Sequence, residues 1–268
     1  MSKRNKIFSY IFLIIASALS IFPFIWMIIG ATNTSTDITK GKITIGKELI
    51  NNITNLFNTV DIGAGVLMSL KVAILGTLLT LIICSMAGYG FEVFKTRRSE
   101  RVMGFIMISM MMPFAAIMVP LFKLFSKIGL LDTSLALILP SISGAFLIYF
   151  FRQNTKSFPH EILEAARVDG LSEYGSFFKI YMPTMKSTYA AAAIITFMSY
   201  WNSFLWPLVS IQSPDKRTLP LVISSLATAY SPDYGMIMVS IIITTIPSAL
   251  IFFLMQKHFV EGIVGSIK

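Results

Sequence analysis

Six long apolar stretches constrain the fold of this chain of 268 residues more than any other feature. They lie at about 7–30, 65–91, 102–124, 133–151, 187–211 and 235–257. A helix rises about 1.5 Å per residue, so roughly 20 apolar residues are needed to cross the ~30 Å hydrocarbon core of a bilayer. The pattern therefore predicts an all-α, polytopic membrane protein with six transmembrane helices.

The composition agrees with lipid as the main solvent and argues against a catalytic centre. Hydrophobic residues make up 55% of the chain and charged residues 13%, which is too apolar for a soluble domain of this size. Cys84 is the single cysteine, so no intrachain disulfide or thiolate metal cluster can form. His160 and His258 are the only histidines, and the apolar stretches hold no HExxH motif or carboxylate pair. We expect no catalytic residue, no metal and no cofactor.

Basic residues predict the orientation in the membrane. The net charge is +9, and the lysines and arginines gather in short clusters between the apolar stretches, which favours a topological role over nucleic-acid binding. With the N-terminus inside, the inner segments carry about twice as many of them as the outer segments, and the contrast is strongest at 95–101. Both termini are therefore predicted to be cytosolic.

The first apolar stretch has an alternative interpretation as a cleaved signal peptide, because Lys3, Arg4 and Lys6 precede it. Its uncharged run is longer than the apolar region of a signal peptide, and more spans follow, so we expect a membrane helix at 7–30.

The order of the spans predicts three regions in the chain. Residues 1–63 would contain the first transmembrane helix and an outside loop. Residues 64–258 would form the transmembrane core, with a cytosolic loop at 152–186, and 259–268 would be a cytosolic tail.

The 152–186 loop is long for a connector and reads as two short helices. Pro159 suits the first turn of a helix, and Glu161 favours the positive end of its dipole. Gly170 is placed to end that helix with a left-handed cap. These residues predict a first helix between 159 and 170.

A second helix is expected directly after the first. Ser172 can cap its N-terminus, and Glu173 lies in its first turn. The helix would run to about Tyr181, where Met182 and Pro183 are expected to stop it.

The first loop helix has a surface that another protein could use. The small Ala165–Ala166 pair allows close approach of a partner backbone, and Glu164 offers a charge for an arginine or a helix N-terminus. The residues by themselves allow a second interpretation, an amphipathic helix that lies on lipid headgroups. Both remain open on physical grounds.

The segment Glu164-Ala-Ala-Arg-Val-Asp-Gly170, followed by Ile180-Tyr-Met-Pro183, resembles the "EAA" loop of ATP-binding-cassette (ABC) importer permeases. Other segments resemble the maltose-type, carbohydrate-uptake branch of these permeases, so that the resemblance covers nearly the whole chain. They are Leu139–Phe146, Phe151–Gln153, Trp201–Leu208, Thr218–Pro220, Gln256–Gly262 and Gly265–Lys268. Two residues depart from the usual pattern: Met182 replaces a leucine, and Ser187 replaces a second proline.

The resemblance implies a type I ABC importer permease fold and a coupling helix at 161–170 that docks into a cleft of an ATP-hydrolysing subunit. The contact and cap positions that the resemblance implies, together with the proline of the motif, are Glu164, Ala165, Ala166, Asp169, Gly170 and Pro183. The chain has no GxxxxGK[ST] phosphate loop, so ATP is expected to bind to the partner.

The resemblance also implies the other components. They would be a second, homologous permease that completes a heterodimer, a dimer of ATPase subunits and an extracytoplasmic sugar-binding protein, all at the cell membrane of a prokaryote. Nucleic acid is not expected. The particular sugar does not follow from the sequence, because the binding protein or the second permease can set it.

Trp201 and Asn202 are weak candidates for substrate contact. An aromatic face and an amide suit the C–H faces and hydroxyls of a sugar, and Trp206 follows closely. A tryptophan near a helix end is more often an anchor at the membrane interface. The substrate-binding residues therefore stay unknown at this level.

Three alternative functions compete with sugar import. A permease for another solute, such as an amino acid or a phosphorylated polyol, would change only the substrate. A polytopic membrane enzyme would need acid, base or metal ligands at membrane depth, and an ion-coupled transporter would be expected to place Asp, Glu or His there. The apolar stretches supply none of these. The sequence therefore favours a sugar ABC permease.

Overall fold

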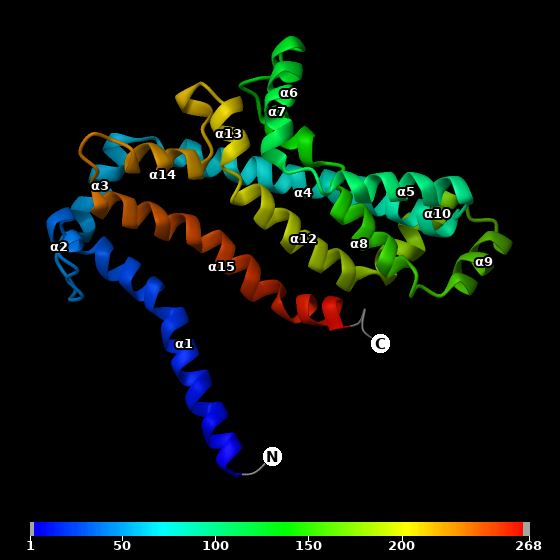
Figure 1. The fold of residues 1–268 in the computed structure, drawn as a ribbon, viewed down its shortest axis with the longest axis horizontal. Coiled ribbons are helices and arrows are strands. Elements are labelled where there is room, and N and C mark those ends of the chain that lie inside the picture. Colours follow the sequence, from blue (N-terminus) through cyan, green and yellow to red (C-terminus); the bar gives the residue numbers. More distant parts are fainter. Residues whose placement is uncertain (1–2, 265–268) are drawn as a thin grey trace. The chain divides into compact units, whose positions relative to one another are not determined.

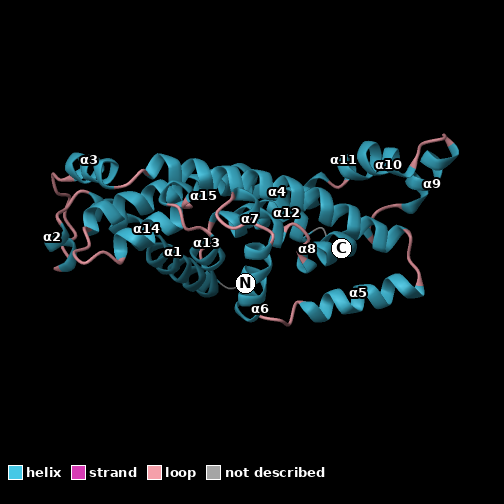
Figure 2. Cartoon of the chain, turned by 90° about the horizontal axis from the view of Figure 1, so that it is seen from above, coloured by secondary structure: helices cyan, strands magenta, loops and turns pink. Residues whose placement is uncertain are grey.

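A computed structural model describes residues 3–264, and throughout this range the chain is built from helices and loops without a strand (Figures 1 and 2). The all-α prediction is confirmed. Residues 265–268 of the predicted cytosolic tail lie outside the described residues.

The chain divides into two compact units. Residues 1–63 and 219–247 form unit 1, and residues 64–218 and 248–268 form unit 2. Unit 1 holds α1 (Lys3–Ala31), α2 (Ser35–Thr39), α3 (Leu49–Thr59), α14 (Leu219–Ala227) and the first part of α15 (Tyr234–Val264). Unit 2 holds most of α4 (Ile62–Val93), then α5 (Arg97–Ser109), α6 (Phe114–Lys127), α7 (Ser134–Ile138), η1 (Leu139–Ser141), α8 (Ala145–Thr155), α9 (His160–Val168), α10 (Glu173–Ser176), η2 (Phe177–Tyr181), α11 (Met182–Thr184), α12 (Lys186–Trp201), α13 (Leu205–Ser210) and η3 (Pro214–Lys216).

Three described helices are long and apolar enough to cross a membrane unaided: α1, α4 and α15. They match the first, second and sixth apolar stretches. Two further pairs reach sufficient length only together, and each pair is bent: α5 with α6 by 101°, and α7–η1 with α8 by 47°. Counting each pair as one span gives up to five. The remaining stretch, 187–211, contains α12 with 16 residues, and α13 follows after a break.

The 101° bend corrects the prediction of one continuous span over 102–124. Helix α5 ends at Ser109, and Pro113 stands as the N-cap of α6 with an extended backbone. Proline has no N–H to donate and disfavours helical geometry at the residue before it, so the helix stops and restarts in a new direction. Hydrophobicity alone does not report this change.

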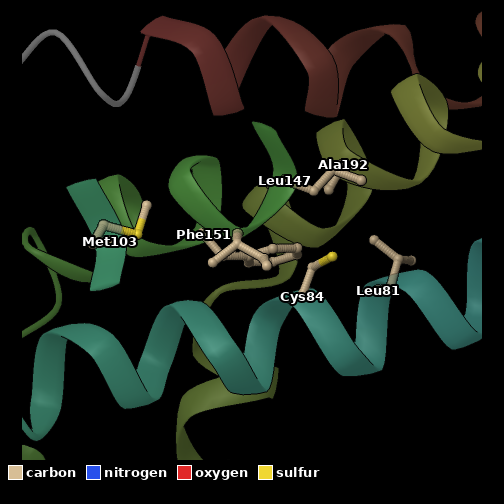
Figure 3. Close-up of a cluster of buried hydrophobic side chains, with 7 residues drawn as sticks. Leu81, Cys84, Met103, Leu147, Phe151 and Ala192 are labelled. Carbon is tan, nitrogen blue, oxygen red and sulfur yellow. The ribbon is translucent and has the colours of Figure 1, made fainter. Parts of the chain in front are cut away.

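Helices α4 and α8 pack closely through a glycine in unit 2. A Cβ on Gly88 would lie 2.6 Å from Cβ of Phe151 and 2.7 Å from the backbone nitrogen of Arg152. Phe151 and Cys84 are fully buried in the cluster beside this contact, together with Leu81, Met103, Leu147, Ile148 and Ala192 (Figure 3). Only glycine allows this approach, because any side chain would push the two helices apart.

Candidate functional site

Helix α9 occupies the position predicted for the first loop helix. It begins after Pro159, which is its N-cap residue, and ends at Val168. Gly170 has the left-handed backbone expected of a cap, with φ of 80°. The N–H of Gly170 donates to Arg167 O at 3.0 Å, and the N–H of Leu171 donates to Ala166 O at 3.0 Å. This pair of bonds is a Schellman motif, which closes the helix rigidly.

The two faces of α9 differ sharply. Leu163 and Ala166 point into the protein, and Ala166 is only 3% exposed. Glu164, Ala165 and Asp169 are exposed on the other side. Within the predicted contact set, Ala166 therefore supports the helix from inside, while Glu164, Ala165 and Asp169 are free to meet a partner.

An aromatic cluster supports the inner face of α9. Its buried members are Tyr89, Phe158, Leu163, Phe177, Tyr181 and Met185. Tyr181 is at the centre, and its hydroxyl shares a 2.6 Å hydrogen bond with the hydroxyl of Thr155 on α8. Burial raises the pKa of Tyr181, so the side chain stays a neutral phenol. The cluster gives α9 a stiff base, because close-packed rings leave little room for rearrangement.

The second loop helix is less regular than predicted and its helical path runs further. Ser172 caps α10 as expected and accepts a hydrogen bond from the N–H of Gly175 at 3.1 Å. After Ser176 the chain winds as a π-helix, η2, and α11 follows directly. The predicted stop at Met182 and Pro183 is therefore wrong.

The π-turn explains why Pro183 does not end the helix. In η2 the N–H of Met182 donates to Phe177 O, five residues earlier. Pro183 then lies in the first turn of α11, where its missing N–H is not needed. The helical path ends two residues later, at Met185, which has φ of −88° and ψ of 20°. Pro183 is exposed and thus accessible.

An ion pair links α9 to α10. Nε of Arg167 donates to Oε1 of Glu173 at 2.8 Å, and the guanidinium lies 6.0 Å from the ring centre of Phe94, the residue directly after α4. The hydrogen bond to Glu173 raises the pKa of Arg167 further. Because both charged side chains are well exposed, the pair fixes orientation more than it adds stability.

A buried arginine that sequence reasoning did not single out joins three helices. Arg152 on α8 is 7% exposed, its Nε donates to Oε2 of Glu92 at 3.0 Å, and its Nη2 donates to Oε1 of Glu100 on α5. The hydrogen bond from Arg152 lowers the pKa of Glu100. The sequence signal that could have found this site is an arginine directly after an apolar stretch. If such an arginine is buried, it needs a carboxylate partner.

Trp201 and Asn202 have different environments. Trp201 is 1% exposed and stacks on Phe197 at 5.8 Å, so it faces neither lipid nor an open cavity. Asn202 is exposed, at the break between α12 and α13. Trp206 is buried, and its Nε1 donates to Ala136 O at 2.7 Å. Of the two weak substrate candidates, only Asn202 has an exposed side chain in this structure.

A cavity of about 390 Å³ opens beside Asn202 within unit 2. Its lining combines hydroxyls, one amide and aromatic rings. The lining residues are Phe114, Leu137, Pro140, Ser141, Ser199, Tyr200, Asn202, Ser203, Phe204, Leu205 and Trp206. A second hollow of about 290 Å³ shares Pro140, Ser141, Ser199 and Tyr200 with it. None of the described residues that line either space carries a charge.

Tyr200 is a structural part of the cavity wall. Its hydroxyl lies 3.1 Å from Thr80 Oγ1 and donates to Ile138 O at 3.1 Å. Its ring packs on α4, where a Cβ on Gly76 would lie 2.7 Å from it. The serines and Asn202 are the polar groups left to face a solute.

Asp132 braces the loop that follows α13 and was also not predicted. It has φ of 60°, and its Oδ1 accepts from the N–H groups of Gln212 and Ser213, each at 3.0 Å. Nζ of Lys216 donates to Oδ2 at 3.0 Å. Hydrogen bonds from Ser213 are the main cause of a pKa of Asp132 well below its usual range.

Comparison with known proteins places the chain in a family. Residues 83–264 match the model of the binding-protein-dependent transport system inner membrane component. The lactose transport system permease protein LacG of Rhizobium radiobacter is 52% identical over 98% of this chain and 96% of its own length. The arabinooligosaccharides transport system permease protein AraQ of Halalkalibacterium halodurans is 33% identical over 93% of this chain and 92% of its own length.

A solved structure shows the same fold. The crystal structure of a bacterial ABC transporter involved in the import of the acidic polysaccharide alginate has a chain with a TM-score of 0.85 and 20% identity. The match covers 97% of this chain and 99% of that one.

The chain therefore belongs to the family of binding-protein-dependent transport system inner membrane components. It is a membrane protein and a permease subunit of an ABC importer, and the family is not one of enzymes. The ABC permease fold inferred from the EAA resemblance is confirmed. Members of this class work with partner subunits.

Proposed function

We propose that this chain forms half of the translocation pathway for a neutral sugar or oligosaccharide. The observation that carries the proposal is the uncharged cavity beside Asn202, which pairs serine hydroxyls and an amide with aromatic rings. Such a lining suits a ligand with many hydroxyls and apolar C–H faces. The names of LacG and AraQ, which specify lactose and arabinooligosaccharides, support the same class.

An anionic solute fits this lining less well. Permeases named for sn-glycerol-3-phosphate are 27% and 29% identical to this chain, and the structural match belongs to an importer of an acidic polysaccharide. A phosphate or carboxylate needs cationic or donor-rich partners when it leaves water. The described residues around the cavity offer no lysine or arginine.

The energy source in this proposal is a pair of partner ATPase subunits that dock on α9. Glu164, Ala165 and Asp169 would form the contact surface, and Gly170 would fix its orientation. ATP-driven closure of the partner would move α9 and bias the permease between inward-open and outward-open states. A second homologous permease would complete the pathway, and an extracytoplasmic binding protein would deliver the sugar.

The proposed location is the cell membrane of a prokaryote, with both termini and the 152–186 segment in the cytosol. The lysine and arginine distribution supports this orientation. The division into 1–63, 64–258 and 259–268 stays a prediction. Impermeant labelling of a Ser172→Cys variant in intact cells would contradict the orientation.

Transport by the reconstituted complex tests the function. The chain, its co-encoded permease, the ATPase subunits and the binding protein are placed in liposomes, and ATP-dependent uptake of lactose, an arabinooligosaccharide and glycerol phosphate is measured. We expect uptake of at least one neutral sugar and none of glycerol phosphate. Uptake of the anion alone would refute the proposed substrate class.

A pair of variants tests the cavity. Asn202→Leu removes the amide from the lining, and Gln212→Leu removes an exposed amide that is not among the cavity residues. We expect Asn202→Leu to raise KM or lower the rate of uptake at unchanged membrane abundance, and Gln212→Leu to change neither. Equal behaviour of the two variants would remove Asn202 from the pathway.

A further inference from the structure

Helix α3 in unit 1 has an exposed apolar face that the transport function does not explain. Ile50 is 75% exposed and Phe57 is 58% exposed, and Ile53 lies between them on the same face. Residues three and seven positions apart share one side of a helix. The neighbouring face is polar and exposed, with Asn51, Asn55 and Asn58. The helix itself contains no charged residue.

The third face of α3 holds it against the end of a membrane-spanning helix. Asn52 is buried, and its Nδ2 donates to Ala31 O at 2.9 Å and to Asn33 O at 3.0 Å. These carbonyls are at the C-terminal end of α1, where the last residues of a helix lack intrahelical donors. Leu56, one turn further on, is fully buried beside this anchor.

Three membrane-spanning helices begin or end next to α3. Helix α1 ends at Ala31, α4 begins at Ile62, three residues after α3 ends, and α15 begins at Tyr234. Gly235 faces Asn52 so closely that a Cβ there would lie 2.5 Å from Oδ1. The hydroxyl of Thr59 lies 3.7 Å from the sulfur of Met236. Three helices of span length and apolar composition that begin or end beside α3 argue for a position of α3 near the membrane surface.

We propose that α3 is an interfacial membrane anchor, whose face of Ile50, Ile53 and Phe57 inserts between the headgroups and acyl chains of one leaflet. An amphipathic helix fixed at this depth can bury its apolar side chains in lipid and keep its asparagines in water. Helix α1, to whose end Asn52 ties α3, has none of its most apolar segment buried within the protein, as expected of a helix surrounded by lipid. Lipid is thus the occupant that this position favours.

Spin labels placed on the two exposed faces test the proposal in the complete importer. Cys84 is the only cysteine of the chain and is buried, so Cys84→Ala gives a cysteine-free permease. Phe57→Cys probes the apolar face and Asn55→Cys is the matched control on the polar face. Ile50→Cys is a second probe if Phe57→Cys fails to assemble. In proteoliposomes, access of each label to lipid-soluble oxygen and to a water-soluble nickel chelate is measured.

We expect the labels at 57 and 50 to shift toward oxygen access and the label at 55 toward the nickel chelate, with or without the binding protein. Equal nickel access at 57 and 55 would overturn the anchor. Loss of oxygen access at 57 when the binding protein is added would also overturn it, because that face would then be a protein-docking surface. These readouts do not depend on transport, so they remain decisive if the sugar proposal fails.

Discussion

Helices α3 and α9 are short helices outside the spans. Both are attached to the protein by buried side chains, but their exposed side chains differ in kind. Each turns two residues into the protein: Asn52 and Leu56 in α3, and Leu163 and Ala166 in α9. The exposed face of α3 includes large apolar side chains. That of α9 carries Glu161, Glu164 and Asp169 around a small alanine.

The difference shows how similar scaffolds are directed to different partners. Large apolar side chains at the depth of the membrane surface favour lipid, whereas charges around a small residue favour a protein that can pair with them. The supports differ in the same way. The α9 base is a packed aromatic cluster that can transmit force, and α3 is tied by hydrogen bonds from one amide to backbone carbonyls.

Removing the buried leucine of each helix should have the largest effect. Leu163→Ala and Leu56→Ala each empty a fully packed position, which typically costs about 2–5 kcal/mol. We expect both to lower the thermal unfolding temperature in detergent. At a temperature where the protein stays folded, only Leu163→Ala should abolish sugar-stimulated ATP hydrolysis. A loss of coupling in both variants would end the distinction between the helices.

Asn52→Leu should have the second largest effect on stability. It leaves the carbonyls of Ala31 and Asn33 without their donor, a loss of about 1–3 kcal/mol for buried polar groups. Thermal unfolding in detergent measures the change, and protease sensitivity of the 32–59 segment should rise. Asn55→Leu, on the exposed face of the same helix, is the control and should leave both unchanged. If the two variants unfold alike, the amide does not hold α3 in place.

Gly170→Val should have a smaller effect on stability but a clear effect on coupling. A side chain at φ of 80° costs about 1–2 kcal/mol for the backbone alone, since no atom lies within 4 Å of the Cβ position. We expect normal membrane abundance with uptake lost, and a milder loss for Gly170→Ala. Gly104→Val, at an open position without positive φ, is the control. Wild-type uptake by Gly170→Val would contradict the docking role of α9.

Glu164→Gln should produce the smallest change in stability, within about 0.5 kcal/mol, because the side chain is exposed. Pull-down of the ATPase subunits should nevertheless be weaker in this variant than in wild type at low ionic strength, and it should depend less on ionic strength, because the neutral amide has no charge for salt to screen. Asn51→Gln on α3 offers a comparable exposed change and should not affect the pull-down. An ATPase interaction indifferent to Glu164 would favour the lipid interpretation of α9 instead.

The sequence predictions succeeded where the signal for a structure lies within the segment that forms it. Long apolar runs gave α1, α4 and α15, since the length needed to cross lipid is a property of the segment itself. Helix α9 and its cap could also be predicted from the sequence, because Pro159 and Gly170 restrict or permit the conformation of their own backbone. Pro113 is a local signal for the helix break, but the residues on both sides are apolar, so hydrophobicity indicated one continuous span.

The errors concern features set by neighbours in space. The π-turn at Phe177–Tyr181 reflects packing of Phe177 and Tyr181 against Tyr89, far away in the chain. Trp201 looked like an interface anchor or a sugar contact, but its ring is buried and stacks on Phe197. Propensity describes a residue and its near neighbours, so it does not report which element will cover them.

The sequence by itself determined the all-helical membrane class, the EAA segment and the left-handed glycine, because hydrophobicity and backbone sterics act locally. Only the tertiary structure decided which side of α9 faces out, that Arg152 clamps Glu92 and Glu100, and that α3 is fixed where three spans begin or end. Each of these depends on distances between residues far apart in the chain, and burial fixes them through contacts that no single segment encodes.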